Sequence, residues 1–231
     1  MRLVLAILLA LSCATALAAP RQVDVKYRVL KNGQPVGEIS EHFEHHERQY
    51  RIESTTSATG IFALFAKGAI VLRSAGDVTG EGLRPLHFEH HRGADPSRLI
   101  VADFDWDKRT VVHKYDDKNE TAVLQSGAQD RLSQLYQFMF QPPRPPQVEF
   151  HTSTGRRLNL YRYRVIGEEA LKTPLGTLQT LHISKQRSPD EDGTDLWLAK
   201  TRHYFPVRIV IDEKDGGKLE QQLESLSFSP D

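Results

Sequence analysis

Alternation of apolar and polar residues with a period of two runs through most of the chain and limits its fold more than any other feature. Val23, Val25 and Tyr27 alternate with charged residues, and the dipeptide Asn32-Gly33 that follows favours a tight hairpin turn. Strand-like runs recur at short intervals over residues 36–43, 49–57, 69–75, 83–90, 98–106, 110–115, 148–152, 157–166, 176–186, 194–199, 207–211 and 218–228. This succession predicts an all-β fold with one main helix, in which an antiparallel sheet is strongly curved or forms an incomplete β-barrel.

One segment departs from the alternation and predicts the main helix, over residues 126–140. Ser126 begins a stretch with capping-box spacing, and Asp130 offers an alternative N-cap. The next apolar residues occupy positions i, i+3, i+4 and i+7 of one helix face: Leu132, Leu135, Tyr136 and Met139. The proline-rich connector 141–147 ends the helix, because proline lacks the amide donor that a helix needs. Strands of similar pattern lie on both sides, so we expect a single β-rich domain over 19–231, in two halves.

The same patterns predict the buried side chains. The hydrophobic content is 39%, which is ordinary for a globular protein and sufficient for a core in a chain of this length. The positions expected to be dry are Val25, Tyr27, Phe43, Ile52, Phe104, Leu135, Tyr136, Trp197 and Ile209.

The first 18 residues have the features of a cleavable secretory signal peptide. Met1-Arg2 supplies a positive charge, an apolar run follows over 3–11, and Ala16-Leu17-Ala18 forms an A-x-A cleavage pattern. The apolar run is too short to span a bilayer. Cys13, the only cysteine, lies within this segment in a poor context for lipidation. We therefore expect a non-lipidated, cysteine-free mature chain in the periplasm, stabilised without disulfides.

Charge gives no reason to expect nucleic acid as a partner. The whole chain carries 30 basic and 30 acidic residues, and these charges are scattered along it. Past the signal segment, no stretch is long and apolar enough to span a membrane as a helix.

The sequence HFEHH occurs twice, over 42–46 and 87–91, and suggests a metal site. On a strand, however, the outer histidines of one copy are about 13 Å apart at roughly 3.3 Å per residue. Two intervening strands would separate the copies by about 14 Å at ~4.8 Å per strand. We therefore interpret each copy as the end of a strand, with Phe43 or Phe88 in the core and the histidines reaching water. No metal and no cofactor are expected.

Other motifs are weaker. Residues 103–107 resemble the start of a calcium loop, but Lys108 and Lys114 occupy the positions of the required glycine and bidentate acid. Asp190, Asp192 and Asp195 surround Gly193 and fit either a cation site or a hairpin turn. The sequence contains no nucleophile elbow, phosphate-binding loop or zinc-protease helix.

The segment 60–68 is apolar where a polar hairpin loop is expected. Its large side chains are the candidate contacts for a ligand or partner: Ile61, Phe62, Leu64 and Phe65. They would form a lid over an apolar cavity or a contact patch. The alternative interpretation is that they plug the open end of the sheet.

Several turn and strand-start motifs resemble the exported domain-of-unknown-function family 3108. They are Tyr27, Gly37, Tyr50, Gly82-Leu83-Arg84-Pro85, Gln129-Asp130-Arg131-Leu132-Ser133, Thr173-Pro174-Leu175-Gly176, Trp197-Leu198 and Tyr204-Phe205-Pro206-Val207-Arg208-Ile209. The resemblance spans nearly the whole mature chain and implies no reaction and no catalytic residues. In architecture alone, the layout is also similar to the incomplete barrels of periplasmic lipoprotein carriers.

These observations favour an exported periplasmic protein that acts without catalysis, as a binding or envelope-assembly factor for an apolar ligand or protein partner. Two alternatives stay open. One is a hydrolase whose site combines dispersed His, Asp and Ser residues, and the other is a structural protein that pairs through a strand edge.

Overall fold

The first and last strands are neighbours in the sheet: β1 (Gln22–Lys31) pairs antiparallel with β15 (Lys218–Ser229). The structure is a computed structural model that describes residues 19–229. The predicted signal peptide over 1–18, with Cys13, lies outside the described residues. Within 19–229, no helix is both long and apolar enough to cross a membrane.

From this central pair the sheet extends in two directions. On one side the strands follow in chain order: β2 (Gln34–His46), β3 (Gln49–Ala58), β4 (Ile70–Thr79), β5 (Gly82–Arg92), β6 (Ile100–Asp105), β7 (Thr110–Tyr115) and β8 (Lys118–Val123). On the other side they follow in reverse order: β14 (Phe205–Asp212), β13 (Gly193–Ala199), β12 (Gly176–Lys185), β11 (Leu158–Thr173), β10 (Gln147–Ser153) and β9 (Gln129–Asp130).

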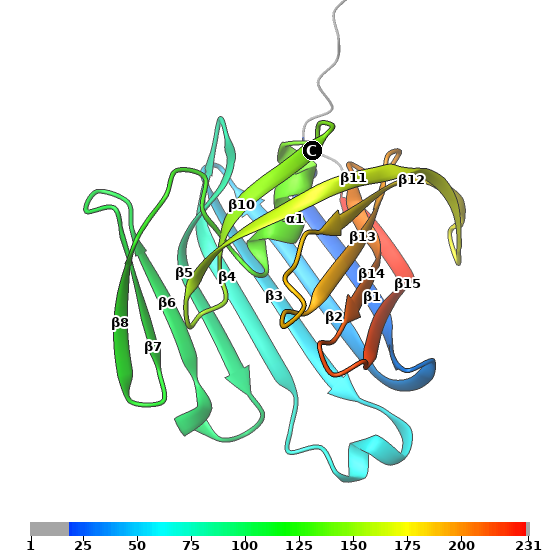
Figure 1. Ribbon diagram of the computed structural model, residues 1–231, viewed down its shortest axis with the longest axis horizontal. Coiled ribbons are helices and arrows are strands. Elements are labelled where there is room, and N and C mark those ends of the chain that lie inside the picture. The colour runs from blue at the N-terminus through cyan, green and yellow to red at the C-terminus, as the bar shows by residue number, and fades with distance from the viewer. Residues whose placement is uncertain (1–18, 230–231) are drawn as a thin grey trace, which may run out of the picture.

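The result is a 15-stranded sheet that curves round on itself without closing into a barrel (Figure 1). All pairs are antiparallel except β9 with β10. Two short 3-10 helices, η1 (Gly60–Leu64) and η2 (Pro96–Arg98), lie in connections of the first half. The predicted fold class, a curved antiparallel sheet with one main helix, is confirmed.

The helix α1 (Ser133–Phe140) lies inside the curve and packs against β5 and β14, one strand from each half. Tyr136 stacks on Phe43 of β2, with ring centroids 5.2 Å apart. Phe138 meets Phe150 of β10 edge to face, at 5.6 Å. Each ring belongs to a different hydrophobic cluster, so α1 is a wedge between the two halves of the sheet.

The helix begins later than the predicted start at Ser126, because the residues before it form the short strand β9. The carboxylate of Asp130 accepts hydrogen bonds from the amides of Leu132 and Ser133, both at 2.8 Å. Its other oxygen accepts from the Ser74 hydroxyl of β4 at 2.6 Å. Neither predicted cap occupies the N-cap position, which is Leu132, but the Asp130 carboxylate just before it binds the first amides and fixes α1 to the sheet.

The buried side chain of Gln137 on α1 supplies hydrogen-bond partners for backbone groups at the start of β5. Gln137 accepts a hydrogen bond from the Leu83 amide (2.7 Å) and donates one to the Glu81 carbonyl (2.8 Å). Gly82 lies between them with φ +92°, and a Cβ there would come within 2.4 Å of the Gln137 oxygen. Only glycine fits this close approach without strain.

The predicted core is confirmed for all but one position. Eight of the side chains expected to be dry are buried: Val25, Tyr27, Phe43, Ile52, Phe104, Tyr136, Trp197 and Ile209. Leu135 is only partly buried, and it lines the cavity described next.

Candidate functional site

A cavity of about 790 Å³ lies on the concave side of the sheet, over the second half and beside α1. Its floor follows from the strand alternation. Leu196 of β13 pairs with Ile209 of β14, and in the next row Thr194 pairs with Ile211. Because paired residues share a face of the sheet, these four side chains form a mainly apolar floor. Its size falls within the range typical of small-molecule sites.

Aromatic and polar side chains border this floor. Tyr161 and Tyr163 extend from β11 on the same face, and Lys185 pairs with Tyr163 from β12. The Lys185 ammonium lies 4.5 Å from the centroid of the Tyr161 ring. Gln134 of α1 donates to the Tyr163 hydroxyl at 2.7 Å, which fixes that ring against the helix.

The remaining wall comes from the distant edge of the sheet, which the β10–β11 turn reaches. Gly155 in this turn packs so closely on Phe88 and Ile100 that a Cβ would lie 2.7 Å from Ile100. Next to it, Arg156 pairs with Asp116 of the β7–β8 turn at 2.7 Å and covers the Tyr115 ring. The turn therefore joins the two halves and brings basic groups to the cavity.

Five basic side chains line the cavity: Lys118, Arg131, Arg156, Arg157 and Lys185. Arg131 is exposed to the cavity but enclosed by its walls, and this desolvation lowers the pKa of its guanidinium. Desolvation, followed by repulsion from Arg131, Arg92 and Arg156, lowers the pKa of His90 to about 4. The concave side thus carries a concentrated positive charge.

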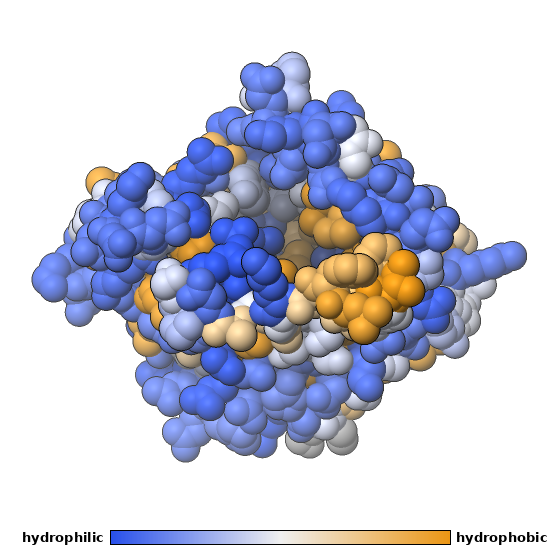
Figure 2. Space-filling model, turned by 90° about the horizontal axis from the view of Figure 1, so that it is seen from below, coloured by the Kyte–Doolittle hydropathy of each residue, from blue (hydrophilic) through white to orange (hydrophobic). Residues whose placement is uncertain are grey.

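The predicted ligand-contact residues lie apart from this lining. In η1 the side chains of Ile61, Phe62 and Leu64 are 69%, 43% and 82% exposed, and Phe65 directly after it is 81% exposed. The helix lies at the lower end of the molecule in Figure 1. Figure 2, seen from below, shows a hollow in this face with hydrophobic side chains gathered beside it. The structure therefore brings the four residues together at the surface, but not onto the cavity floor.

The two HFEHH stretches lie on β2 and β5, with β3 and β4 between them. Phe43 and Phe88 are fully buried, as expected. On the opposite face, His42 bonds to Asp24 at 2.7 Å and His87 bonds to Asp103 at 2.7 Å. His42 and His87 therefore bridge to carboxylates on the neighbouring strands, whereas His46 and His91 contact Glu44 and Glu89 on their own strands. Within residues 19–229, no group of three His, Cys, Asp or Glu is arranged to hold a metal.

The two acidic motifs also serve the local structure. Asp103 accepts from Lys114 at 2.7 Å, and Asp105 accepts from the Lys108 amide at 2.9 Å, so residues 103–107 form the end of β6 and the start of the β6–β7 turn. Asp192 accepts from the Lys214 amide at 2.9 Å, whereas Asp195 bonds to His182 at 2.8 Å. The carboxylates thus face different partners.

A serine and a histidine do meet at one place, as the hydrolase alternative requires. His113 Nε2 lies 2.9 Å from Ser153 Oγ, which also accepts from the Gly155 amide at 3.1 Å. Both side chains are buried, with exposures of 1% and 0%. The pair therefore links β7 to β10 and does not present a nucleophile to a cleft.

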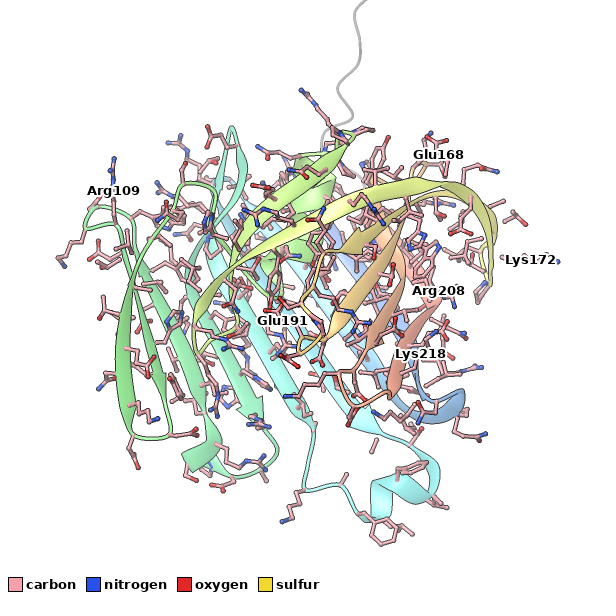
Figure 3. All side chains as sticks on the ribbon, viewed as in Figure 1. Arg109, Glu168, Lys172, Glu191, Arg208 and Lys218 are labelled. Carbon is pink, nitrogen blue, oxygen red and sulfur yellow. The ribbon has the colours of Figure 1, made fainter. Side chains whose placement is uncertain are left out.

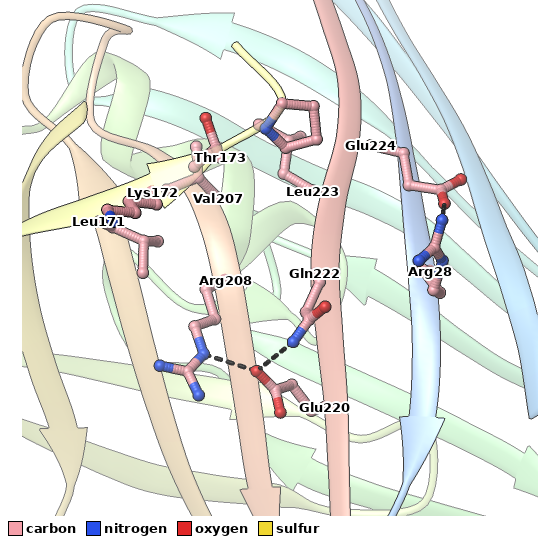
Figure 4. A pocket seen from close by; sticks show the side chains of 11 residues that line it. Arg28, Leu171, Lys172, Thr173, Val207, Arg208, Glu220, Gln222, Leu223 and Glu224 are labelled. Atoms are coloured by element: carbon pink, nitrogen blue, oxygen red, sulfur yellow. Dashed lines mark hydrogen bonds and ion pairs between the residues drawn. The ribbon is translucent and has the colours of Figure 1, made fainter. Parts of the chain in front are cut away.

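A second cleft, of about 520 Å³, lies on the outer side under the overhanging β11–β12 hairpin. Figure 3 places Lys172 of this hairpin at the side of the molecule and Glu191 of the β12–β13 loop near its centre. In the outer cleft Arg28 pairs with Glu224 at 2.6 Å (Figure 4). Arg208 pairs with Glu220 at 2.7 Å. Because these charges are already neutralised, we regard the concave cavity as the candidate site.

The sequence did not predict the basic residues of the cavity. Arg131 stands within the segment 129–133 that resembles the family, and this is the only signal that singled it out. Arg156 and Lys185 are ordinary surface residues in the sequence, and their meeting depends on the path of the β10–β11 turn.

Similarity to known proteins concerns the fold. The chain is similar to a beta-barrel-like protein of domain of unknown function DUF1849 from Brucella abortus, with a TM-score of 0.53 and 11% identity over 91% of this chain and 98% of that one. The lipoprotein LppX of Mycobacterium tuberculosis aligns with a TM-score of 0.26 and 10% identity over 92% and 90% of the two chains, which is too low to support a structural argument. No match was found among curated proteins.

The family resemblance seen in the sequence is confirmed. The family model described as a protein of unknown function, DUF3108, matches residues 22–224, which is most of the chain. The chain therefore belongs to the DUF3108 family.

Proposed function

We propose that the protein is an exported, non-enzymatic binding protein of the periplasm that holds an apolar or amphipathic ligand in the concave cavity. The observation that carries this proposal is the cavity itself. It has a volume of about 790 Å³, an apolar floor that includes Leu196 and Ile209, and aromatic side chains at its border. Export rests on the signal-like segment over residues 1–18.

The exposed helix η1 supports the same proposal. Three large apolar side chains on a five-residue helix with no buried residue, with a fourth at Phe65 directly after it, are costly in water unless they meet a partner. We propose that Ile61, Phe62, Leu64 and Phe65 contact the ligand during its transfer, or the surface that delivers it. The double substitution Phe62→Asp and Phe65→Asp should therefore slow uptake of the ligand while leaving the fold intact.

Native mass spectrometry of the protein purified from the cells that make it tests the proposal. We expect the wild-type chain to retain a small molecule. Ile211→Asp places a charge on the half-buried floor and should abolish this retention. Leu160→Asp is the matched control, because Leu160 is 37% exposed and lies on the other face of β11.

Recovery of empty wild-type protein that also takes up no apolar probe would contradict the binding proposal. Equal retention by wild type and Ile211→Asp would show that the small molecule binds outside the concave cavity. Turnover of an ester or amide substrate by the wild type would instead favour the hydrolase.

A further inference from the structure

The basic side of the cavity has fewer carboxylates than basic groups. The lining includes five basic side chains and only two acidic ones, Glu120 and Asp192. Glu120 accepts a hydrogen bond from the Tyr115 hydroxyl at 2.6 Å. Asp192 accepts one from the Lys214 amide at 2.9 Å. These two carboxylates and Asp116, which pairs with Arg156, offset only part of the charge of the five basic groups, so the cavity keeps a net positive charge.

Arg131 shows this imbalance most clearly. Among residues 19–229 its guanidinium has no hydrogen bond or ion pair to another side chain. Its surroundings are largely desolvated, which lowers its pKa, yet an arginine stays protonated in proteins. Arg131 is exposed where it lines the cavity and Asp130 is the carboxylate that acts on it electrostatically, so its guanidinium is free to bind an anion, which would relieve its partial desolvation.

Neighbouring groups add to the positive potential. Arg92 of β5 acts electrostatically on Arg131, whereas His90 of the same strand is held neutral because Arg131, Arg92 and Arg156 disfavour its protonated form. Arg157 lies beside Arg156 in the β10–β11 turn and also lines the cavity. Several cations around one concave surface focus the field and attract an anion to it. Guanidinium groups suit phosphate and carboxylate oxygens, which they can bind in a bidentate manner.

The apolar floor and the basic wall together define an amphipathic ligand. We propose that Arg131, supported by Arg156, Arg157 and Lys185, binds the phosphate or carboxylate headgroup of a ligand whose hydrocarbon part lies on the floor near Ile211. This inference rests on the proposed function, because it names the chemical class of the ligand in the same cavity.

Titration calorimetry with four probes tests the inference: dodecyl phosphate, dodecanoate, dodecanol and inorganic phosphate. We expect dodecyl phosphate and dodecanoate to bind more tightly than dodecanol, with affinity that falls as salt rises. Arg131→Gln should weaken the two anionic probes by about tenfold or more and leave dodecanol unchanged. Arg157→Gln should have a smaller effect of the same sign. Arg164→Gln is the control, since Arg164 is exposed on the other face of β11. Thermal unfolding confirms that each variant is folded.

The outcomes separate the two proposals. Equal affinity for dodecanol and dodecyl phosphate, unaffected by Arg131→Gln, would overturn the headgroup site and leave the apolar binding function standing. Binding of inorganic phosphate as tight as that of dodecyl phosphate, with no binding of dodecanol, would support the anion site but overturn the amphipathic ligand and the proposed function. If no probe binds to the folded wild type, both proposals fail.

Discussion

The outer face of the first half and the basic wall of the cavity use charge in opposite ways. On the outer face, the Arg73 guanidinium lies 2.8 Å from the Glu53 carboxylate on the next strand, and His87 lies 2.7 Å from Asp103. On the cavity wall, Arg131 has no such partner among the described residues. Ion pairs between neighbouring strands stabilise their register on a solvent-exposed face. A cation in a concave cavity that has no ion-pair partner in the protein can instead bind an anionic ligand.

One sequence motif shows both situations. In the second HFEHH stretch, His87 and His90 lie on opposite faces of β5. Partial burial opposes protonation of His87, but its hydrogen bonds to Glu89 and Asp103 outweigh this and raise its pKa. Desolvation and three nearby guanidinium groups lower the pKa of His90 to about 4. The same residue type therefore reports the paired charges of one face and the unpaired charges of the other.

The largest effect is expected inside the curve of the sheet, at Asp130. Asp130→Ala leaves the amides of Leu132 and Ser133 and the hydroxyl of Ser74 without their acceptor. We expect the free energy of unfolding to fall by about 2–4 kcal/mol, from loss of these buried hydrogen bonds. Urea unfolding measures this loss.

The control for this variant is Asp105→Ala, which removes a carboxylate that accepts the amide of Lys108 on an exposed hairpin. Its cost should be much smaller than that of Asp130→Ala, because the Asp105 carboxylate is exposed to water. Equal losses of stability for the two variants would show that the burial of Asp130 between the two halves of the sheet does not strengthen its contribution to stability.

A much smaller effect is expected on the outer face. Arg73→Gln removes a side chain that is 45% exposed and paired with Glu53. Because water and salt screen such a pair, we expect a loss of at most about 1 kcal/mol, shrinking further at high salt. Urea unfolding at low and high ionic strength provides the test. A loss above about 2 kcal/mol that is insensitive to salt would mean that the ion pairs of the outer face are a major source of the stability of the fold.

The fold was largely predictable because most strands have one dry face and therefore a clear period of two. β8 was missed for the opposite reason: its sequence, KNETAV, has no dry face, and its side chains are mostly exposed. The helix was predicted with its apolar stripe, but not its burial on both sides, because Gln134 and Gln137 are polar in sequence and buried only through partners on distant strands.

The candidate site was much less predictable. The apolar segment with Phe62 and Phe65 is visible in the sequence because its residues are consecutive. The basic wall is not visible, because Arg131, Arg156 and Lys185 come from a helix start, a turn and a strand end that only the curvature of the sheet brings together. Unpaired charge is a property of the folded chain and leaves no local pattern.

The contrast between the two faces fixes the sign of two pH effects. For His90, the pKa is lower in the folded than in the unfolded chain. Its contribution to stability is therefore present above pH 6.5, the unfolded value, and is lost as the pH falls through about 4. For His87, the pKa is higher in the folded than in the unfolded chain. Its contribution to stability is therefore present below pH 6.5, the unfolded value, and is lost as the pH rises through the folded pKa.

An NMR titration of the histidine rings, assigned with His87→Gln and His90→Gln, tests the central claim most directly. We expect His90 to titrate near pH 4 and His87 above pH 6.5, and Arg131→Gln to raise the pKa of His90 only. Dodecyl phosphate should raise the pKa of His90 as well, because a bound anion stabilises the protonated ring. Titration of both histidines near pH 6.5, unchanged by Arg131→Gln, would contradict an enclosed and uncompensated positive wall.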